Sequence, residues 1–391
     1  MNQAKKRIVV IGGGFMGLLA ARNAAKDPSV QVTVLDRSPS FVFLPRLIDA
    51  LGNPSFPKER YIASLEAVGK RDGFAFVHGE ALSINRSEKF VTYQSHGRQE
   101  PDTLAYDALL YATGSRTKFF NTPGAADFSY PLKSLDDLAR VHAHIAQVLE
   151  RAHASTDVVE QRRLLSFVVV GGGPSGVESA FALRSFVRAW CAEHTSKIDT
   201  LASYALVQAG PQILPGFPAK LVQGAMAVLA HERITVYVGE SVTRVEQDQI
   251  TTSLRRVVPA STVLWTAGVE PIVIKCEPEM HTDGAGIIVD NALHVDQAHL
   301  AGGDATSYRE QNVLIPKNAQ TAMRMARVAA KNLSYCTSEQ MPALYHYRAL
   351  GNIITVGTTG FFDIRGFILR SSFVPLLRDL IYRLRMRQMV G

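Results

Sequence analysis

The feature that most constrains the fold is a glycine-rich stretch near the start of the chain. An apolar run at residues 8–11 leads into Gly12, Gly14 and Gly17, and a helical stretch and a second apolar run then lead to Asp36. The order strand, glycine turn, helix, strand and acidic residue is typical of a dinucleotide-binding unit. The glycines permit a tight turn and a close approach of the backbone to a pyrophosphate. The start of the helix offers N–H groups to the phosphates, and Asp36 is placed to bind a ribose hydroxyl.

The same pattern occurs a second time in the middle of the chain. An apolar run at residues 167–170 leads into Gly171, Gly173 and Gly176, and a long helical stretch follows. The next apolar run ends at Gln208, where a carboxylate is usual. Two such units in one chain indicate one site for each of two dinucleotides.

Length and composition limit the remaining options. At 391 residues the chain exceeds one ordinary hydrophobic core, so we expect at least two domains. No apolar run reaches the ~18–20 residues that span a bilayer, and the first residues, MNQAKKR, predict no signal peptide. Three distant cysteines argue against a disulfide framework and favour a reducing compartment. Cys191 and Cys336 are interpreted as spectators, and the histidines and cysteines show no metal-ligand spacing.

Three further motifs follow in the order Ala112-Thr113-Gly114, Thr266-Ala267-Gly268 and Gly302-Gly303-Asp304-Ala305. With both glycine turns, the chain resembles the two-dinucleotide flavoprotein family from residue 7 to about 333. In that family the first turn holds FAD and the second holds a nicotinamide nucleotide. The segments GGGFMGL, FVFLPRL, GGGPSGVE, LPGFP, LWTAGVEP and PKNAQTA are more closely similar to type II NADH dehydrogenases, the single-chain NADH:quinone oxidoreductases. Disulfide reductases of the wider family carry a cysteine pair after the first turn. This chain has no cysteine before Cys191, so dithiol chemistry is excluded.

The expected fold class is therefore α/β, with two Rossmann-like dinucleotide-binding domains and a short C-terminal helical region for membrane association. The expected division gives residues 1–117 and 291–340 to the FAD-binding domain and residues 118–290 to the NAD(P)H-binding domain. Residues 341–391 would form a C-terminal region with an amphipathic basic helix.

The resemblance also implies which residues form the sites. FAD would contact Gly12, Gly14, Gly17, Asp36, Ala112, Thr113, Gly114 and Asp304. The nicotinamide nucleotide would be lined by Gly171, Gly173, Gly176, Glu178, Gln208 and Gly268. Further residues expected along the cofactors are Phe15, Met16, Arg37, Pro45, Ala81, Pro174, Ser175, Ala267 and Gly303. Ala319 and Gln320 would lie under the flavin, near a quinone.

Glu178 and Gln320 are the candidate catalytic residues. Glu178 is interpreted as acting at the nicotinamide or in proton delivery; the competing explanation is an acid stabilised by the helix dipole in a first turn. Gln320 is interpreted as acting on the quinone side; the competing explanation is an ordinary polar surface residue. At Gln208 a neutral amide does not repel a 2′-phosphate, so we expect use of both NADH and NADPH.

The predicted function is FAD-dependent transfer of two electrons from NADH or NADPH to a quinone, without proton pumping. Two alternatives stay open. One is a flavin reductase for a protein acceptor such as a ferredoxin, and the other is a non-catalytic nucleotide-sensing flavoprotein. No metal or nucleic-acid partner is expected, and a homodimer is left open.

The end of the chain suggests a membrane partner. Six arginines and two aspartates fall between Asp363 and Arg387, within a net charge of +7 for the whole chain. Residues 373–384 place Phe373, Leu376, Leu377, Leu380, Ile381 and Leu384 on one helical face, with Arg378, Asp379 and Arg385 on the other. A helix packed on the protein's own core is the competing explanation. We favour a peripheral protein at the cytoplasmic side of a membrane, with the apolar face in the bilayer interface and the arginines near anionic head groups.

Overall fold

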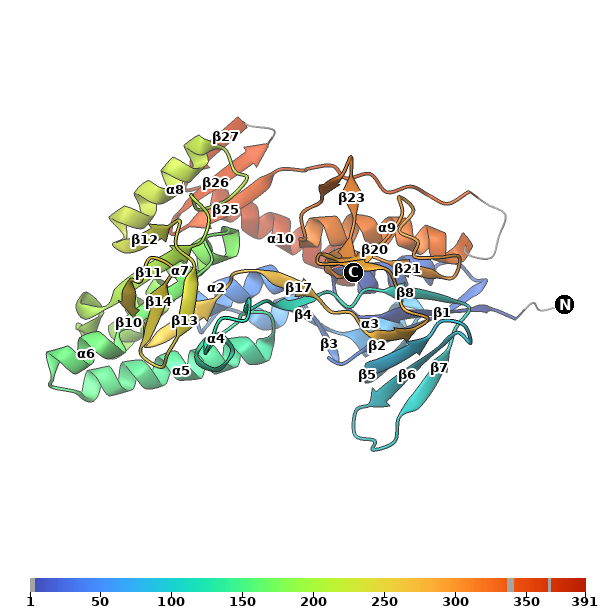
Figure 1. Cartoon of the computed structure of the whole chain (residues 1–391), viewed down its shortest axis with the longest axis horizontal. Helices are drawn as coiled ribbons and strands as arrows, with labels where there is room; N and C mark the ends of the chain where they lie inside the picture. Colours follow the sequence, from blue (N-terminus) through green and yellow to red (C-terminus); the bar gives the residue numbers. More distant parts are fainter. Residues whose placement is uncertain (1–3, 336–340, 365–366) are drawn as a thin grey trace.

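The computed structural model describes residues 4–335, 341–364 and 367–391, so Cys336 lies outside the described residues. Two α/β units lie side by side, and a C-terminal region contacts both of them (Figure 1). The predicted fold class, with two Rossmann-like units and a C-terminal helix, is confirmed.

The first unit is built on a mixed sheet with the strand order β21-β8-β1-β2-β5-β6-β7. At its centre β1 (Lys6–Ile11) pairs in parallel with β2 (Val30–Asp36) and β8 (Ala108–Tyr111). The helix α1 (Phe15–Ala24) connects β1 to β2, and α9 (Ala319–Tyr335) packs against α1. The central strand is buried from residue 8 onward, as expected for a strand covered on both faces. The other strands are β5 (Ala75–Asn85), β6 (Phe90–Ser95), β7 (Asp102–Ala105) and β21 (His299–Ala301).

The second unit is built on a four-stranded parallel sheet in the order β12-β11-β10-β16. Its strands are β10 (Ser166–Val170), β11 (Ser203–Gln208), β12 (Ile234–Val238) and β16 (Thr262–Trp265). The helix α7 (Pro174–Glu193) connects β10 to β11, and α8 (Ala219–His231) connects β11 to β12. The long helix α5 (Leu135–Ala154) precedes this sheet in the chain, and the Ser134 hydroxyl caps it by accepting a hydrogen bond from the Asp137 backbone N–H at 3.0 Å.

Two strand pairings and one helix join the units. The strand β9 (Ser115–Thr117), which leads out of the first unit, pairs antiparallel with the returning strand β17 (Val269–Pro271). Shortly afterwards β18 (Lys275–Glu277) pairs with β5, so the chain has rejoined the first unit by that point. In addition, α2 (Leu47–Gly52) packs against α7 of the second unit.

The remaining elements are short and lie in the connections. They are β3 (Ser40–Val42), η1 (Leu44–Arg46), η2 (Lys58–Tyr61), β4 (Ile62–Ser64), α3 (Leu65–Asp72), α4 (Ala125–Phe128), α6 (Val158–Leu164), η3 (Ile198–Leu201), β13 (Val242–Val245), β14 (Gln249–Thr252), β15 (Val257–Pro259), β19 (Thr282–Asp283), β20 (Gly286–Ile288), η4 (Gly303–Ala305), β22 (Thr306–Ser307), β23 (Arg309–Glu310) and β24 (Val313–Leu314).

The C-terminal region is more than a helix. It contains an antiparallel sheet of β25 (Asn352–Val356), β26 (Thr359–Ile364) and β27 (Phe367–Ser371), followed by α10 (Val374–Val390). In Figure 1 these strands lie beside α8 of the second unit, whereas α10 runs back toward the first unit. The sequence analysis missed β26 and β27, because their pattern is not separated from the surrounding apolar residues.

The orientation of α10 corrects one part of the sequence prediction. Leu376, Leu380 and Leu384 are exposed, with 65%, 54% and 54% of their surface accessible. In contrast, Arg378, which was expected on the outer polar side, is only 7% exposed. The reason is that carboxylates on α2 and α7 face this side of α10 and pair with the arginine. Among the described residues no helix has both the length and the apolar character needed to cross a bilayer.

Candidate functional site

The first glycine turn has a shape that only glycine permits at two of its positions. Gly12 has φ +103°, and a Cβ atom there would overlap the carbonyl oxygen of Ala112. A Cβ atom at Gly17 would overlap the carbonyl oxygen of Gly12, because α1 crosses β1 closely at this point. These two glycines therefore set the path of the turn and the packing of α1 on the sheet.

Gly14, by contrast, faces open space. It is the N-cap of α1, no side chain caps this helix, and a Cβ atom would meet no heavy atom within 4 Å. The turn is held from the other side by Asp36, which accepts hydrogen bonds from the backbone N–H of Gly13 at 2.5 Å and of Ser38 at 2.7 Å. An uncapped helix N-terminus with an open approach fits the pyrophosphate of a dinucleotide.

The second glycine turn repeats this geometry. Gly171 has φ +108°, and Gly173 is an N-cap without a side-chain cap whose Cβ atom would meet nothing within 4 Å. The side chain of Gln208 takes the place of Asp36, since its Oε1 accepts a hydrogen bond from the Gly172 backbone N–H at 2.8 Å. With its oxygen held there, the amide offers its nitrogen, Nε2, as the group available to a ligand. Ala267 lies directly beside Gly171, at the end of β16.

The Gly-Asp turn joins three segments of the first unit. Asp304 in η4 accepts a hydrogen bond from the Ser115 hydroxyl at 2.8 Å, and its backbone carbonyl accepts one from Lys317 Nζ at 2.6 Å. Met16 of α1 lies against Gly303. Asp304 therefore sits where β9, α1 and the start of α9 meet. Ser115 and Lys317 were not predicted. Ser115 directly follows the Ala112-Thr113-Gly114 motif and Lys317 lies within the PKNAQTA segment, which was the available signal in the sequence.

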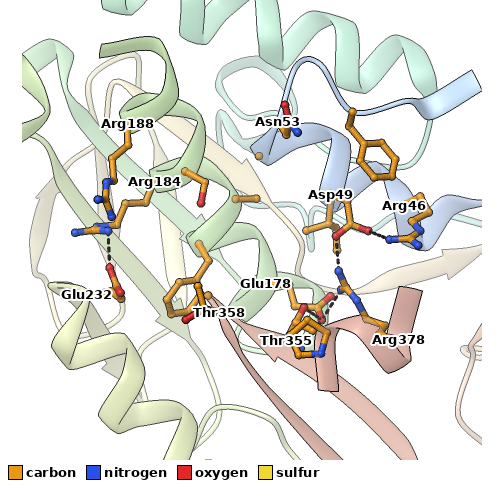
Figure 2. A pocket seen from close by; sticks show the side chains of 18 residues that line it. Arg46, Asp49, Asn53, Glu178, Arg184, Arg188, Glu232, Thr355, Thr358 and Arg378 are labelled. Atoms are coloured by element: carbon orange, nitrogen blue, oxygen red, sulfur yellow. Dashed lines mark hydrogen bonds and ion pairs between the residues drawn. The ribbon is translucent and has the colours of Figure 1, made fainter. Parts of the chain in front are cut away.

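Glu178 lies apart from this turn, at the floor of a cavity of about 460 Å³ between α2, α7 and the C-terminal region (Figure 2). Its Oε1 accepts hydrogen bonds from the Thr355 backbone N–H at 2.8 Å and hydroxyl at 2.9 Å, and from Arg378 Nη1 at 3.1 Å. Burial raises the pKa of Glu178, while Arg378 and Thr355 act in the opposite direction. The carboxyl is thus held by the last strand and helix of the chain.

A charged network extends from Glu178 into the first unit. Arg378 also pairs with Asp49 of α2, and Asp49 pairs with Arg46 at 2.9 Å. Arg46 is buried, pairs with Asp379 of α10, and donates to the Tyr61 hydroxyl at 2.9 Å. Figure 2 shows Asp49 between the two arginines. The network ties α2, α7 and α10 together, and an Arg–Asp pair three residues apart in the apolar FLPRLIDAL stretch was the available sequence signal.

Other predicted site residues are placed as follows. Gln320 is exposed in the first turn of α9 and does not line the cavity that contains Glu178. Phe15 packs edge-on against Phe41 and Phe43, and Pro45 lies in η1 beside Arg46. Ala81 is in β5, at an irregularity of its pairing with β6.

Cys191 and Cys276 are buried free thiols. In the described part of the chain, no cluster of three or more histidine, cysteine or acidic side chains could hold a metal ion.

The two sheets and their open glycine turns define the class of a two-dinucleotide oxidoreductase. The chain belongs to the pyridine nucleotide-disulphide oxidoreductase family, whose model matches residues 6–326. This family is FAD-dependent, and the prediction of FAD and a nicotinamide nucleotide as cofactors is confirmed. The residues around Gly14 and Gly173 fit these two groups.

Proteins with similar sequences are named as quinone oxidoreductases. A type II NADH:quinone oxidoreductase of Haemophilus influenzae is 25% identical over 95% of this chain and 93% of its own length. An external alternative NAD(P)H-ubiquinone oxidoreductase of Arabidopsis thaliana mitochondria is 29% identical over 68% of this chain, and the chain spans only 47% of that protein. The predicted resemblance to type II NADH dehydrogenases is confirmed.

A solved structure shows the same fold. NDH2 from Plasmodium falciparum, in complex with NADH, superposes with a TM-score of 0.89 and covers 98% of this chain and 96% of its own. At 18% sequence identity this likeness supports the fold, including the C-terminal region.

Proposed function

We propose that this protein is an FAD-dependent oxidoreductase that transfers two electrons from NADH or NADPH to a quinone, without proton pumping. The observation that carries the proposal is the pair of open, uncapped helix N-termini at Gly14 and Gly173, one in each unit. The quinone follows from the printed names of the Haemophilus and Arabidopsis relatives. Bound FAD would supply the two-electron chemistry, and the side chains described below bind and orient the reactants.

The first unit would hold FAD. The N–H groups at the start of α1 face the pyrophosphate, Asp36 faces the ribose, and Asp304 fixes the other end of the site through Ser115 and Lys317. The proposed division into an FAD domain of residues 1–117 and 291–340 and an NAD(P)H domain of 118–290 rests on the two sheets. The pairing of β18 with β5 favours a return to the FAD domain somewhat earlier, near residue 275.

The second unit would hold the nicotinamide nucleotide. The start of α7 binds its pyrophosphate in the same way, and Gln208 faces the ribose of its adenosine half. A carboxylate at this position would accept from the 2′-hydroxyl and repel a 2′-phosphate, whereas the amide nitrogen donates to either group. We therefore propose that both nucleotides serve as donors.

Glu178 is proposed to exchange a proton at the acceptor side. Because burial raises its pKa, it can carry a proton nearer to neutral pH than an exposed glutamate does, which suits a group that serves proton transfer. Arg378 and Thr355 fix the position of Oε1. Gln320, exposed at the start of α9, is proposed to lie on the quinone side of the flavin.

The exposed face of α10 would attach the protein to the cytoplasmic side of a membrane. Phe373, Leu376, Leu380 and Leu384 are exposed along one side of the helix, and Phe367 and Leu369 of β27 are exposed in the same region of the chain. Exposed apolar patches of this kind mark protein or membrane contacts, and a lipid-soluble quinone favours the membrane.

Anaerobic stopped-flow reduction followed by reoxidation tests this proposal. The flavin absorbance should bleach with NADH and with NADPH, and a soluble short-chain quinone should restore it over many turnovers. Bleaching without reoxidation by quinone would favour a protein acceptor, with activity that falls steeply as salt is raised. A flavin that neither nucleotide reduces would favour the nucleotide-sensing alternative.

A further inference from the structure

A second cavity lies at the C-terminal end of α1, opposite the end that follows the glycine turn, and the proposed electron transfer does not use it. It measures about 1010 Å³ and is bounded by α1, α9 and the end of α10. The lining residues that matter here are polar or charged: Arg22, Lys26, Asp72, Arg327, Lys331 and Gln388.

The cavity carries an excess of positive charge. Four cationic side chains line it, Arg22, Lys26, Arg327 and Lys331, against two carboxylates, Asp27 and Asp72. Both carboxylates are already engaged. Asp72 pairs with Arg22 and Arg71, which lower its pKa to about 2, and Asp27 accepts hydrogen bonds from Ser29.

The other three cations lack such partners. Lys26, Arg327 and Lys331 are exposed, and within residues 4–335, 341–364 and 367–391 none of them has a carboxylate at ion-pair distance. Arg327 and Lys331 stand one turn apart on α9, so their charges repel each other. Arg385 of α10 lies near this cluster, and burial together with the neighbouring Arg327 lowers the pKa of its guanidinium.

The cavity is continuous with the exposed face of α10. Leu376, Leu380 and Leu384 stand four residues apart, so they form one ridge along the helix. The next position of the same ridge is Gln388, which lines the cavity. An apolar chain lying along the ridge would thus end at the cluster of cations.

We propose that this cavity binds the phosphate headgroup of an anionic phospholipid, with Lys26, Arg327 and Lys331 as its ligands and the leucine ridge beside the acyl chains. The inference rests on the proposed attachment of α10 to a membrane and adds a lipid preference to it. Basic pockets next to an apolar membrane-facing surface have the charge and position that anionic headgroups require.

The test compares two triple variants of the full-length, FAD-loaded protein. K26Q/R327Q/K331Q removes the three cavity cations that have no carboxylate partner, and the control R98Q/K197Q/K220Q removes three exposed cations elsewhere, with the same change in net charge. Binding is measured by co-sedimentation with vesicles of phosphatidylcholine alone and with 30 mol% phosphatidylglycerol, roughly a physiological anionic content. We expect the wild type and the control to prefer the anionic vesicles, and the cavity variant to lose this preference by roughly tenfold or more.

Three results would overturn the proposal. Equal losses in both triple variants would show a general charge effect, and an unchanged preference in the cavity variant would show that the cavity takes no headgroup. If inorganic phosphate raises the melting temperature of the wild type, but the protein does not prefer anionic vesicles, the site belongs to a soluble anion. Turnover with NADH and a soluble quinone should be the same in all variants. Loss of that activity in the wild type itself would count against the proposed function, not the lipid site.

Discussion

Replacing Arg378 by methionine tests whether the C-terminal helix is held by buried charge. Arg378 is the contact between α10 and both α2 and α7, through Asp49 and Glu178. Methionine keeps much of the length and apolar volume of the side chain but removes the guanidinium. Two mostly buried carboxylates then remain, of which Asp49 still has Arg46 at 2.9 Å, while Glu178 keeps Thr355.

The expected loss of stability follows from the contacts that remain. Breaking a buried ion pair by removing one partner costs about 3–5 kcal/mol. Because Arg46 still neutralises Asp49, we expect the lower end, about 3 kcal/mol, or roughly 150-fold in the opening equilibrium of α10. The matched control, Arg383→Met, removes a more exposed arginine of the same helix that pairs with Asp379 at 2.7 Å, and should cost less than about 1 kcal/mol.

The cost should also depend on pH in a defined direction. Burial already raises the pKa of Glu178, and loss of Arg378 raises it further. A carboxyl whose folded pKa lies above its unfolded value favours folding at low pH, and this contribution is lost as the pH rises through the folded pKa. The deficit of Arg378→Met should therefore be larger at pH 8 than at pH 5.5, and Glu178→Gln in the same chain should restore part of the stability.

Hydrogen exchange of the α10 and β25 amides measures the stability of these segments directly, because each segment reports its own local opening. Protection in these two segments should fall in Arg378→Met and recover partly in the double variant, while β1 and β2 stay unchanged. If Arg378→Met behaves like Arg383→Met, or if its deficit is the same at both pH values, the network does not hold the helix.

Three further predictions follow from the sites. Gly14→Val should fold, because its Cβ meets open space, but should be purified without yellow flavin, whereas Gly17→Val should fail to fold; a fully flavinated Gly14→Val protein would refute the assignment of this turn. Gln208→Glu should raise the NADH-to-NADPH ratio of kcat/KM by roughly tenfold, on the order of one charge pair near the surface, and an unchanged ratio would mean that this side chain does not face the ribose. Leu376→Ser with Leu380→Ser should weaken binding to liposomes and turnover of long-chain quinones while sparing soluble quinones. Equal binding by this variant and the wild type would refute a membrane contact through this face of α10.

The dinucleotide units could be predicted because their determinants are local. Gly12 and Gly171 are required by backbone angles of φ +103° and +108°. The Ser134 hydroxyl caps α5 by accepting a hydrogen bond from the backbone N–H of Asp137, three residues further along the chain. Each of these constraints acts within a few residues, so a single sequence displays it. The Gln208 position could also be found, since the pairing of β10 with β11 follows from their apolar patterns.

The charged network could not be predicted in the same way. Arg378 meets Glu178 across 200 residues of sequence and Asp49 across 329. The helical pattern of residues 373–384 shows that leucines and arginines occupy opposite sides, but not which side faces the protein. That choice depends on carboxylates brought there by α2 and α7, and no residue near α10 in the sequence signals their presence. The strands β26 and β27 were missed for a related reason, because their pairing with β25 is what separates them from an apolar loop.

The middle of α10 departs from the pattern of an ordinary surface helix, and this has a physical explanation. Arg378 is buried there, whereas Leu376, Leu380 and Leu384 are exposed. A helix that covered a hydrophobic core would turn its leucines inward and leave its arginines in water. Here the inward side meets Asp49 and Glu178, so a buried arginine is the side chain that balances them, and the leucines are left outside. Exposed apolar patches of this kind mark protein or membrane contacts. A bilayer would cover it on one side while Arg378 holds the other side on Glu178. One helix would then fix the distance between the membrane surface and the proposed proton-exchanging carboxyl.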